Sequence, residues 1–400
     1  HVGINFGLGT SQVGRLAIKD HKIYFEYEPD FLKSGLEISP FRLPGRPGVT
    51  SFEQALFDGL PGVFHDCLPD GWGRLLFDRS IRSKGIIPSD ITPLDRLAYM
   101  GNHALGALTF TPDHNLNHPH GDVHLDHIAL DAEKIMTGAS DEILARLISL
   151  NGSSAGARPK ALIGVNHGRD HIIHGAHDLP DQYEPWIVKF SNSHDGTDAG
   201  AIEYVYALMA KKAGVQMPDI HLFPSSSSPG FFAAKRFDRD GTRRFHMHSA
   251  CGLLHSDFRT PSLDYEDLIT LTAALTRDMR EVEKVYRLAV FNILAHNRDD
   301  HSKNFSFLMD SQGIWRFAPA YDLTFSSGPG GEQSTTIMGE GRAPELGHLH
   351  KLAEEAKITK RAADDVIEAT RTSLATWPEL ARKFGVTPDH ISIISQRIMA

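Results

Sequence analysis

Cysteine is scarce in this chain of 400 residues, which contains only Cys67 and Cys251. Two cysteines this far apart in the sequence argue against a disulfide framework and favour a reducing compartment. The sequence also lacks an apolar run as long as a membrane span, and no signal peptide opens it. We therefore expect a cytoplasmic protein without a membrane partner.

An excess of basic charge is missing as well. The formal net charge is −9, from 41 Lys and Arg against 50 Asp and Glu, and no stretch forms a basic patch. Direct binding to nucleic acid is therefore not favoured. The hydrophobic fraction of 41% and the charged fraction of 23% are typical of a soluble globular protein. The length predicts two or three domains.

Histidine, in contrast, is abundant, with 23 residues in the chain. Two short stretches are rich in it: His114, His118, His120, His124 and His127 in the first, and His167, His171, His174 and His177 in the second. Metal binding is conceivable because histidine is the commonest ligand for transition metals. The first stretch, however, lies in a predicted connector at 114–130 with Pro, Asn and Gly and without a cysteine partner, so we favour solvated loop histidines.

The stretch HNRDDHSKN at residues 296–304 carries the clearest chemical signal. It follows an apolar helical run, precedes two short strand-like runs, and is followed by Asp322 behind the second of them. An Arg-Asp pair, four residues, an Asn and then a second Asp is the order of a kinase catalytic loop and metal-binding segment. Asp299 would serve the attacking hydroxyl, while Asn304 and Asp322 would hold Mg²⁺. Ordinary turn chemistry is the alternative for such residues.

The preceding part of the chain has the order of a kinase small lobe. A predicted hairpin at 161–174 is followed by a strand at 186–190 with Lys189, a helix at 198–213 with Glu203, and further strands at 220–223 and 231–237. A lysine inside an apolar strand is costly unless its ammonium meets an anion. ATP phosphates and Glu203 would both serve; an edge-strand lysine facing solvent is the alternative.

Two further segments would complete a nucleotide site. Residues 151–160, NGSSAGARPK, are small and would bring backbone N–H groups against phosphates, although they lack both G-x-G-x-x-G and G-K-[ST]. A plain linker is the alternative. Residues 231–239, FFAAKRFDR, would supply the hinge, whose backbone would hydrogen-bond the adenine.

The remaining sequence divides into recognisable parts. Strands at 2–6, 12–18 and 22–27 predict an antiparallel meander, which helices at 51–60 and 71–83 (the second capped by Asp70) and a strand at 105–110 complete. We predict an α+β domain at 1–113, a connector with one helix at 114–150, a small lobe at 151–245 and a helical lobe at 246–400. The helical lobe has apolar periodicity at 264–274, 279–295, 345–357, 362–374 and 377–384.

These motifs together resemble the HipA family, the serine/threonine kinase toxins of bacterial HipBA toxin–antitoxin modules. In the first domain the resemblance rests on FEYEPDFL at 25–32, LPDGWG at 68–73, RLAYMG at 96–101 and LGALTF at 105–110. In the kinase part it rests on SAGARPK at 154–160, KRFDR at 235–239, DDHSKNF at 299–305 and PAYD at 319–322. The N-terminal motifs make the match specific.

The resemblance implies a two-lobed protein-kinase-like α+β fold with an added N-terminal subdomain, ATP and Mg²⁺ as cofactors, and Asp299 as catalytic base. Asn304 and Asp322 would bind metal. The nucleotide-binding residues would be Lys189, Ser153, Ser154, Ala155, Gly156, Ala157, Lys235, Phe237, Asp238, His301 and Lys303. Family members are regulated by phosphorylation in the loop at 151–158, where Ser153, or alternatively Ser154, holds the register.

The family also implies partners. Its best-known members phosphorylate an aminoacyl-tRNA synthetase, and a HipB-like helix-turn-helix antitoxin brings them to DNA only indirectly. This chain departs from the family pattern at Asp300, a second acid, and at Arg158-Pro159. Neither removes a required group, and we expect replacement of Asp300 to matter far less than that of Asp299. A kinase of small molecules or lipids, or a non-catalytic partner-binding protein, remains the alternative.

Overall fold

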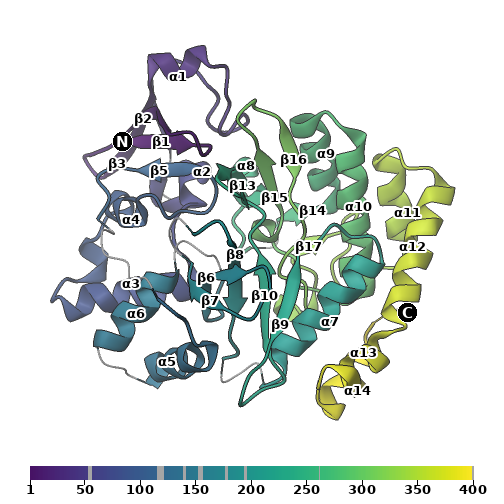
Figure 1. The fold of residues 1–400 in the computed structure, drawn as a ribbon. Coiled ribbons are helices and arrows are strands. Elements are labelled where there is room, and N and C mark those ends of the chain that lie inside the picture. The colour runs from purple at the N-terminus through teal and green to yellow at the C-terminus, as the bar shows by residue number, and fades with distance from the viewer. Residues whose placement is uncertain are drawn as a thin grey trace. The chain divides into compact units, whose positions relative to one another are not determined.

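The computed structural model describes residues 1–52, 56–114, 121–137, 141–151, 156–175, 179–192, 196–260 and 262–398, shown as a ribbon in Figure 1. The chain forms two compact units. Unit 1 contains residues 1–197, 223–248 and 309–313, and unit 2 contains residues 198–222, 249–308 and 314–400. The division into four parts at 113, 150 and 245 stays a prediction.

The first sheet of unit 1 has the strand order β4-β3-β2-β1-β5. Its strands are β1 (Val2–Asn5), β2 (Thr10–Lys19), β3 (Lys22–Tyr27), β4 (Val49–Ser51) and β5 (Leu108–Phe110). The predicted meander is confirmed, because β1, β2 and β3 pair antiparallel in sequence order. In β3 the residues Ile23, Phe25 and Tyr27 are buried, as the alternation of side chains along a half-buried strand requires.

The second sheet contributes β7-β6-β8-β10 to unit 1. These are β6 (Lys160–Asn166), β7 (Ile172–His174), β8 (Tyr183–Lys189) and β10 (Phe231–Lys235), followed by the short strands β11 (Arg239–Asp240), β12 (Arg243–Arg244) and β13 (His246–Ser249). β6 pairs antiparallel with β8 along its whole length, and β8 with β10. The predicted strands of this region are therefore confirmed.

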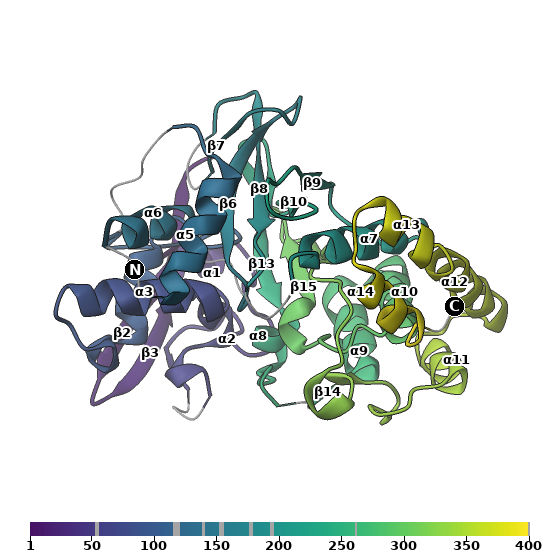
Figure 2. The same ribbon diagram turned by 90° about the horizontal axis from the view of Figure 1, so that it is seen from below.

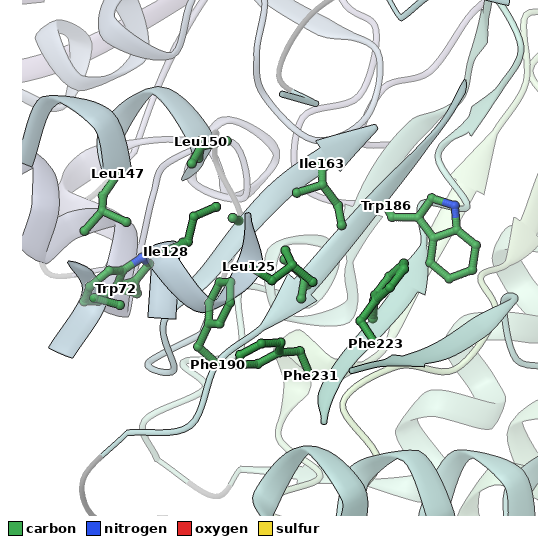
Figure 3. Close-up of a cluster of buried hydrophobic side chains, with 14 of the residues drawn as sticks. Trp72, Leu125, Ile128, Leu147, Leu150, Ile163, Trp186, Phe190, Phe223 and Phe231 are labelled. Atoms are coloured by element: carbon green, nitrogen blue, oxygen red, sulfur yellow. The ribbon is translucent and has the colours of Figure 1, made fainter. Parts of the chain in front are cut away.

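The helices of unit 1 are α1 (Pro29–Lys33), α2 (Gly62–His65), α3 (Gly71–Ser83), α4 (Pro93–Met100), α5 (Leu125–Thr137) and α6 (Asp141–Asn151), with 3-10 turns η1 (Phe57–Gly59) and η2 (Pro88–Asp90). Of these, α3, α5 and α6 share a core with the second sheet. Figure 3 shows part of the shared core, where Leu147, Leu150 and Trp72 from α6 and α3 lie with Ile163 of β6. The buried apolar faces of α3, α5 and α6 thus hold them together with β6, β8 and β10.

Two sequence predictions in unit 1 are wrong. The helix expected at 51–60 is absent from the described residues, where β4 ends at Ser51 and η1 forms at Phe57–Gly59. Phe57 and Asp58 both adopt positive φ, which ends helical continuity. The second error is the connector at 114–130: residues from Leu125 onward form α5, because Leu125, Ile128 and Ala132 recur at helical spacing and are buried.

Unit 2 is mainly helical. It contains α7 (Ala199–Lys212), α8 (Ala250–Leu254), α9 (Tyr265–Thr276), α10 (Met279–Leu294), α11 (Leu346–Glu355), α12 (Lys360–Leu374), α13 (Trp377–Lys383) and α14 (Pro388–Ser395). Its short elements are β14 (Leu263–Asp264), β15 (Ser306–Met309), β16 (Trp315–Phe317), β17 (Thr335–Thr336), η3 (Ser302–Asn304) and η4 (Pro329–Gly331). Strand β9 (Ile220–Phe223) is where the chain passes from unit 2 back to unit 1. In both views α11, α12, α13 and α14 lie close together (Figures 1 and 2). The predicted helices are confirmed, whereas α8 and α14 were not predicted.

Helix α7 belongs to unit 2, although the sequence placed it in the small lobe. Its Tyr206 hydroxyl donates to the Ala295 carbonyl at 2.8 Å, and the Ser373 hydroxyl donates to the Met209 carbonyl at 2.7 Å. Most of its side chains are buried, so it packs over much of its circumference. Glu203 is buried with them.

No helix in the described part of the chain combines the length and the apolar character that a membrane span needs.

Candidate active site

The catalytic-loop stretch begins where the buried helix α10 ends. Asp278 caps this helix by accepting a hydrogen bond from the Arg280 N–H at 2.9 Å. The apolar side chains between Val282 and Leu294 are buried. After Ala295 the chain turns through His296, whose φ is +56°. His296 stacks on Phe325 with ring centroids 5.4 Å apart. The helix end and this stacking fix the start of the loop.

Asp299 lines a cavity of about 530 Å³ within unit 2. The other residues of its wall come from the loop before α9, from the catalytic loop and from the segment after β16: Phe258, Arg259, His301, Ser326, Ser327, Gly328, Pro329 and Ser334. The predicted catalytic aspartate therefore lies at a space large enough for part of a second molecule. His301, predicted to bind nucleotide, also lines this cavity, and the Lys303 ammonium lies 4.5 Å from the Phe258 ring centroid.

Asn304 is oriented by the backbone of Asp299. Its Nδ2 donates to the Asp299 carbonyl oxygen at 2.7 Å. With the amide nitrogen bound in this way, the amide oxygen is the atom able to ligate a cation, and oxygen is the donor that Mg²⁺ prefers. The structure thus joins the predicted base and one predicted metal ligand.

The segment carrying Asp322 is tied to the same loop. The Tyr321 hydroxyl donates to the Lys303 carbonyl at 2.6 Å and lies 2.6 Å from the Ser306 hydroxyl. Tyr321, which precedes Asp322, is thus bonded to Lys303, which precedes Asn304, and to Ser306, which follows it by two residues. Asp322 itself has a φ of +59°, an uncommon conformation that functional residues often adopt. The metal-binding roles of Asn304 and Asp322 stay predictions.

Asp300 is the centre of a buried polar network that the sequence did not predict. Its carboxylate accepts four hydrogen bonds, from the Tyr265 hydroxyl at 2.7 Å, Gln333 Nε2 at 3.1 Å, Ser334 N at 3.0 Å and Thr335 N at 3.2 Å. Burial raises the pKa of Asp300 to about 6, while these donors act in the opposite direction. Asp300 therefore has a structural role in unit 2, and the expectation that its replacement matters far less for transfer than that of Asp299 stays a prediction.

Asparagines extend this network toward α10. Asn292 Nδ2 donates to the Tyr265 hydroxyl at 2.9 Å, and Asn297 Nδ2 donates to Asn292 Oδ1 at 3.0 Å. Asn297 stands where the commonest kinase motif has histidine, and here its role is to bind the end of α10. The signal in the sequence that could have indicated this network is a polar residue inside an apolar helix, such as Asn292 in α10.

Arg298 binds the segment after β16 through backbone carbonyls. Its guanidinium donates to the carbonyls of Gly331 and Arg342, the second at 3.0 Å. Its own carbonyl accepts from Ser334 N at 3.1 Å and from Ser334 Oγ at 2.9 Å. Burial and the nearby Arg397 lower the pKa of Arg298. The loop and the segment at 326–342 therefore form one hydrogen-bonded assembly.

The predicted nucleotide residues of unit 1 occupy separate elements. Lys189 ends β8, is half-buried, and has its ammonium 5.9 Å from the Phe232 ring centroid. Its register partner on β6 is the buried Lys160. Because Glu203 belongs to unit 2, its predicted pairing with Lys189 stays a prediction. Ser153, Ser154 and Ala155 lie outside the described residues.

Gly156 is bound by the N-terminal domain. Its N–H donates to Asp70 Oδ1 at 2.5 Å, and its carbonyl accepts from the Trp72 N–H at 3.0 Å. Asp70 occupies the N-cap position of α3 but makes no side-chain cap bond there, so its predicted capping role is wrong. A phosphate contact at the Gly156 N–H would require this hydrogen bond to break. The role of Ala157 stays a prediction.

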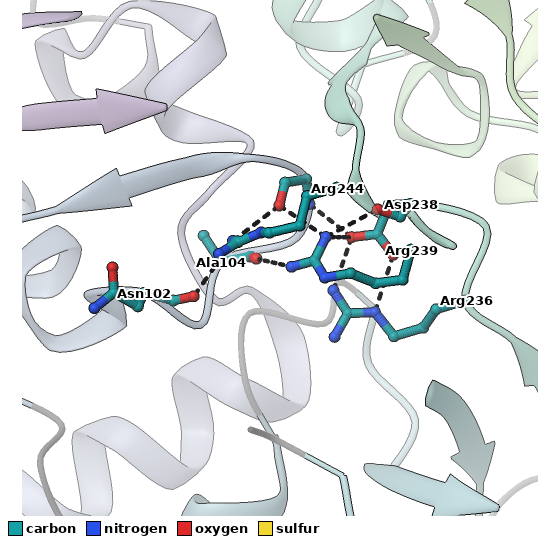
Figure 4. A network of polar contacts seen from close by, with 7 residues as sticks. Asn102, Ala104, Arg236, Asp238, Arg239 and Arg244 are labelled. Carbon is teal, nitrogen blue, oxygen red and sulfur yellow. Dashed lines mark hydrogen bonds and ion pairs between the residues drawn. The ribbon is translucent and has the colours of Figure 1, made fainter. Parts of the chain in front are cut away.

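The predicted hinge contains an ion cluster centred on Asp238 (Figure 4). Arg236 Nη2 and Arg239 Nη1 each donate to the Asp238 carboxylate at 2.7 Å, and the Gly106 N–H donates at 2.8 Å. These partners give Asp238 a structural role, and its predicted contact with nucleotide stays a prediction. Lys235 pairs with Glu184 at 2.6 Å. The hinge role of the backbone at Lys235 and Phe237 stays a prediction.

The histidine-rich stretches show no metal cluster where they are described. In the described ranges no three His, Cys, Asp or Glu side chains are arranged to hold a metal ion. His171 instead lies 2.6 Å from the Tyr183 hydroxyl and 3.3 Å from Asp122. His118, His120 and His177 lie outside the described residues.

Comparison with known structures identifies the fold class of the chain. Over its whole length the chain superposes on HipA of Shewanella oneidensis MR-1, solved with HipB and its operator DNA, with a TM-score of 0.71, 18% identity and 96% of that chain covered. The predicted fold class, an α+β kinase-like fold of two lobes with an added N-terminal subdomain, is confirmed by this likeness.

Sequence models of the family match both halves of the chain. The model of the HipA N-terminal domain matches residues 5–111, and that of the HipA-like C-terminal domain matches residues 152–377. The chain belongs to the HipA family. It is also 27% identical over 192 residues to Y4mE of Sinorhizobium fredii, whose name assigns it provisionally to the kinases. That match spans 45% of this chain and 44% of the relative.

Proposed function

We propose that this protein is an ATP- and Mg²⁺-dependent serine/threonine protein kinase, the toxin of a toxin–antitoxin module in the cytoplasm. The observation that supports it most is the cavity lined by Asp299, with Asn304 bonded to the backbone of that same residue. A carboxylate beside a cavity and an amide oxygen next to it are the groups that phosphoryl transfer requires.

Each residue has a defined role in this proposal. Asp299 orients the acceptor hydroxyl and takes its proton as the oxygen attacks the γ-phosphorus, while the bond to the ADP oxygen breaks. The oxygens of Asn304 and Asp322 fit Mg²⁺, which would neutralise charge on the phosphates. Lys189 would bind the phosphates as a point charge.

Family membership supports a proposal for regulation and for partners. Phosphorylation at Ser153, or alternatively Ser154, would place about −1.5 to −2 charges in the loop meant to cover ATP phosphates, and would switch the enzyme off. A HipB-like antitoxin is the proposed partner, since the Shewanella relative was solved with HipB and operator DNA. An aminoacyl-tRNA synthetase is the proposed substrate, and contact with DNA would be indirect.

Replacement of the catalytic residues tests the activity. With γ-labelled ATP, Mg²⁺ and a bacterial lysate, we expect Asp299→Ala and Asp322→Ala each to lower protein labelling at least about 1,000-fold. The matched control is Asp365→Ala on the exposed face of α12, which should label as wild type does.

The same experiment separates the alternatives. Label recovered only in small molecules or lipids would favour the alternative kinase class, and no label with wild type would favour a binding protein. Residual activity within a few-fold of wild type for Asp299→Ala would contradict the assignment. Intact-mass analysis of Ser153→Ala and Ser154→Ala after incubation with ATP identifies the phosphosite.

A further inference from the structure

Asp300 is a buried carboxylate that the proposed reaction does not use. It is 1% exposed, and it follows directly after the proposed base Asp299. Two of its four donors are the consecutive backbone N–H groups of Ser334 and Thr335, which both bind Oδ1. The other two, Tyr265 and Gln333, bind Oδ2. Both oxygens are therefore committed to other parts of unit 2.

The bonded segment is held at this place by several further contacts. The Thr335 hydroxyl donates to the Asp300 carbonyl, and β17 pairs in parallel with β14, matching Leu263 with Thr335. Asp264 Oδ2 accepts from the Thr336 hydroxyl and from the Gly339 N–H, both at 2.8 Å. The segment at 333–339 thus lies between the catalytic loop and the start of α9.

This segment also forms a wall of the cavity. Ser334, which donates its N–H to Asp300, lines the cavity together with residues 326–329 and Asp299 itself. Gly328 approaches the loop closely, because a Cβ built on it would lie 2.6 Å from Arg298 Cβ. A shift of Asp300 would therefore change the wall of the cavity that the proposed base also lines.

We infer that Asp300 is a positioning residue that fixes the wall of the acceptor cavity relative to Asp299. The inference rests on the proposed kinase function for the meaning of the cavity, but the positioning itself is a property of unit 2. Asp300 acts through Ser334 and Thr335 and touches neither the acceptor nor the nucleotide. Its loss should weaken acceptor recognition more than nucleotide binding.

Glu281 supplies a matched control for a merely stabilising carboxylate. It is also buried in unit 2, at 6% exposure, and its Oε2 accepts from the Phe317 N–H at 2.8 Å. Its contacts are to β16 and Lys284, and it does not line the cavity. Glu281→Gln and Asp300→Asn therefore remove the same charge from comparable sites with different neighbours.

The first measurement is hydrogen exchange of the full-length protein, which needs no activity. We expect amides at 326–336 to exchange at least about tenfold faster in Asp300→Asn than in wild type, and to be unchanged in Glu281→Gln. Gln333→Met, which removes one neutral donor and keeps the carboxylate, should give an intermediate increase. Unchanged exchange at 326–336 in Asp300→Asn would overturn the inference. If Asp300→Asn does not fold, exchange at 326–336 in Gln333→Met is the test: faster exchange than in wild type supports the inference, and unchanged exchange overturns it.

The second measurement is kinetic, with dephosphorylated casein as the acceptor and the labelled lysate protein once it is identified. Asp300→Asn should raise KM for the acceptor at least tenfold, and change the dissociation constant of a non-hydrolysable ATP analogue less than threefold. Equal effects on both, or an acceptor KM equal to that of Glu281→Gln, would refute the acceptor role. Absence of transfer by wild type would refute the proposed kinase, while the exchange result would still decide the positioning.

Discussion

Two buried aspartates, one in each unit, are held in opposite ways. Asp238 in unit 1 lies between two arginines, whereas Asp300 in unit 2 receives only neutral donors. The arginines hold the pKa of Asp238 well below its usual range despite complete burial. For Asp300, burial outweighs the four dipoles and raises the pKa to about 6.

The contrast shows that burial alone does not decide the state of a carboxylate. A full opposite charge at 2.7 Å offsets desolvation, while hydroxyl and amide dipoles offset it only in part. The charge-paired site belongs to the framework of unit 1. The site held by neutral donors, Asp300, lies beside the proposed catalytic base. We therefore expect small shifts of its carboxylate to affect function.

The largest expected effect is the loss of the Asp238 charge. Asp238→Asn leaves the nearly buried guanidinium groups of Arg236 and Arg239 without their anion, so the free energy of unfolding should fall by about 3–5 kcal/mol. Chemical denaturation at pH 7 measures this difference. A loss below about 1 kcal/mol would show that the arginines find other partners, and would erase the contrast with Asp300.

A smaller effect is expected for the equivalent change at Asp300. In Asp300→Asn the new Nδ2 cannot accept from Tyr265 or Gln333, and the neutral Oδ1 accepts more weakly from Ser334 and Thr335, but no buried charge loses its partner. The free energy of unfolding should therefore fall by less than about 1.5 kcal/mol at pH 7. The same denaturation series measures it. A loss as large as that of Asp238→Asn would mean that the charge itself is essential at Asp300.

The smallest expected effect is a pH dependence of opposite sign at the two sites. Because the folded pKa of Asp300 is raised, wild type should lose stability relative to Asp300→Asn as pH rises from about 4 to about 6. Because the folded pKa of Asp238 is lowered, wild type should lose its advantage over Asp238→Asn as pH falls below about 4. Thermal unfolding at several pH values compares the two slopes, and slopes of equal sign would contradict the assignment.

Local pattern was sufficient to predict most elements of this chain. The alternation in β3 and the apolar periodicity of α10 and α12 are strong signals. The order of residues 296–304 singled out Asp299, which lines a cavity, while its catalytic role stays a prediction. Helix α5 was missed because the surrounding histidines and the Pro-containing connector suggested a loop. Nucleotide binding and the identity of the acceptor stay predictions.

Long-range contacts explain what the sequence could not predict. Asp238 receives the N–H of Gly106, which precedes it by 132 residues, and Asp300 receives those of Ser334 and Thr335, some 34 and 35 residues later. Asp238 was taken for a hinge residue because its neighbours in sequence suggested one. Only tertiary structure shows that an acid next to two arginines is bound to both of them.

The contact between Gly156 and the N-terminal domain has a consequence for dissecting the chain. A fragment that starts at residue 114, or at residue 152 where the C-terminal family model begins, lacks Asp70 and Trp72 and leaves the N–H and carbonyl of Gly156 to solvent. Gly71 also fits against Gly156, since a Cβ there would meet the Gly156 oxygen at 2.4 Å. We therefore expect expression of the second matched region alone to produce a protein with an altered segment before β6.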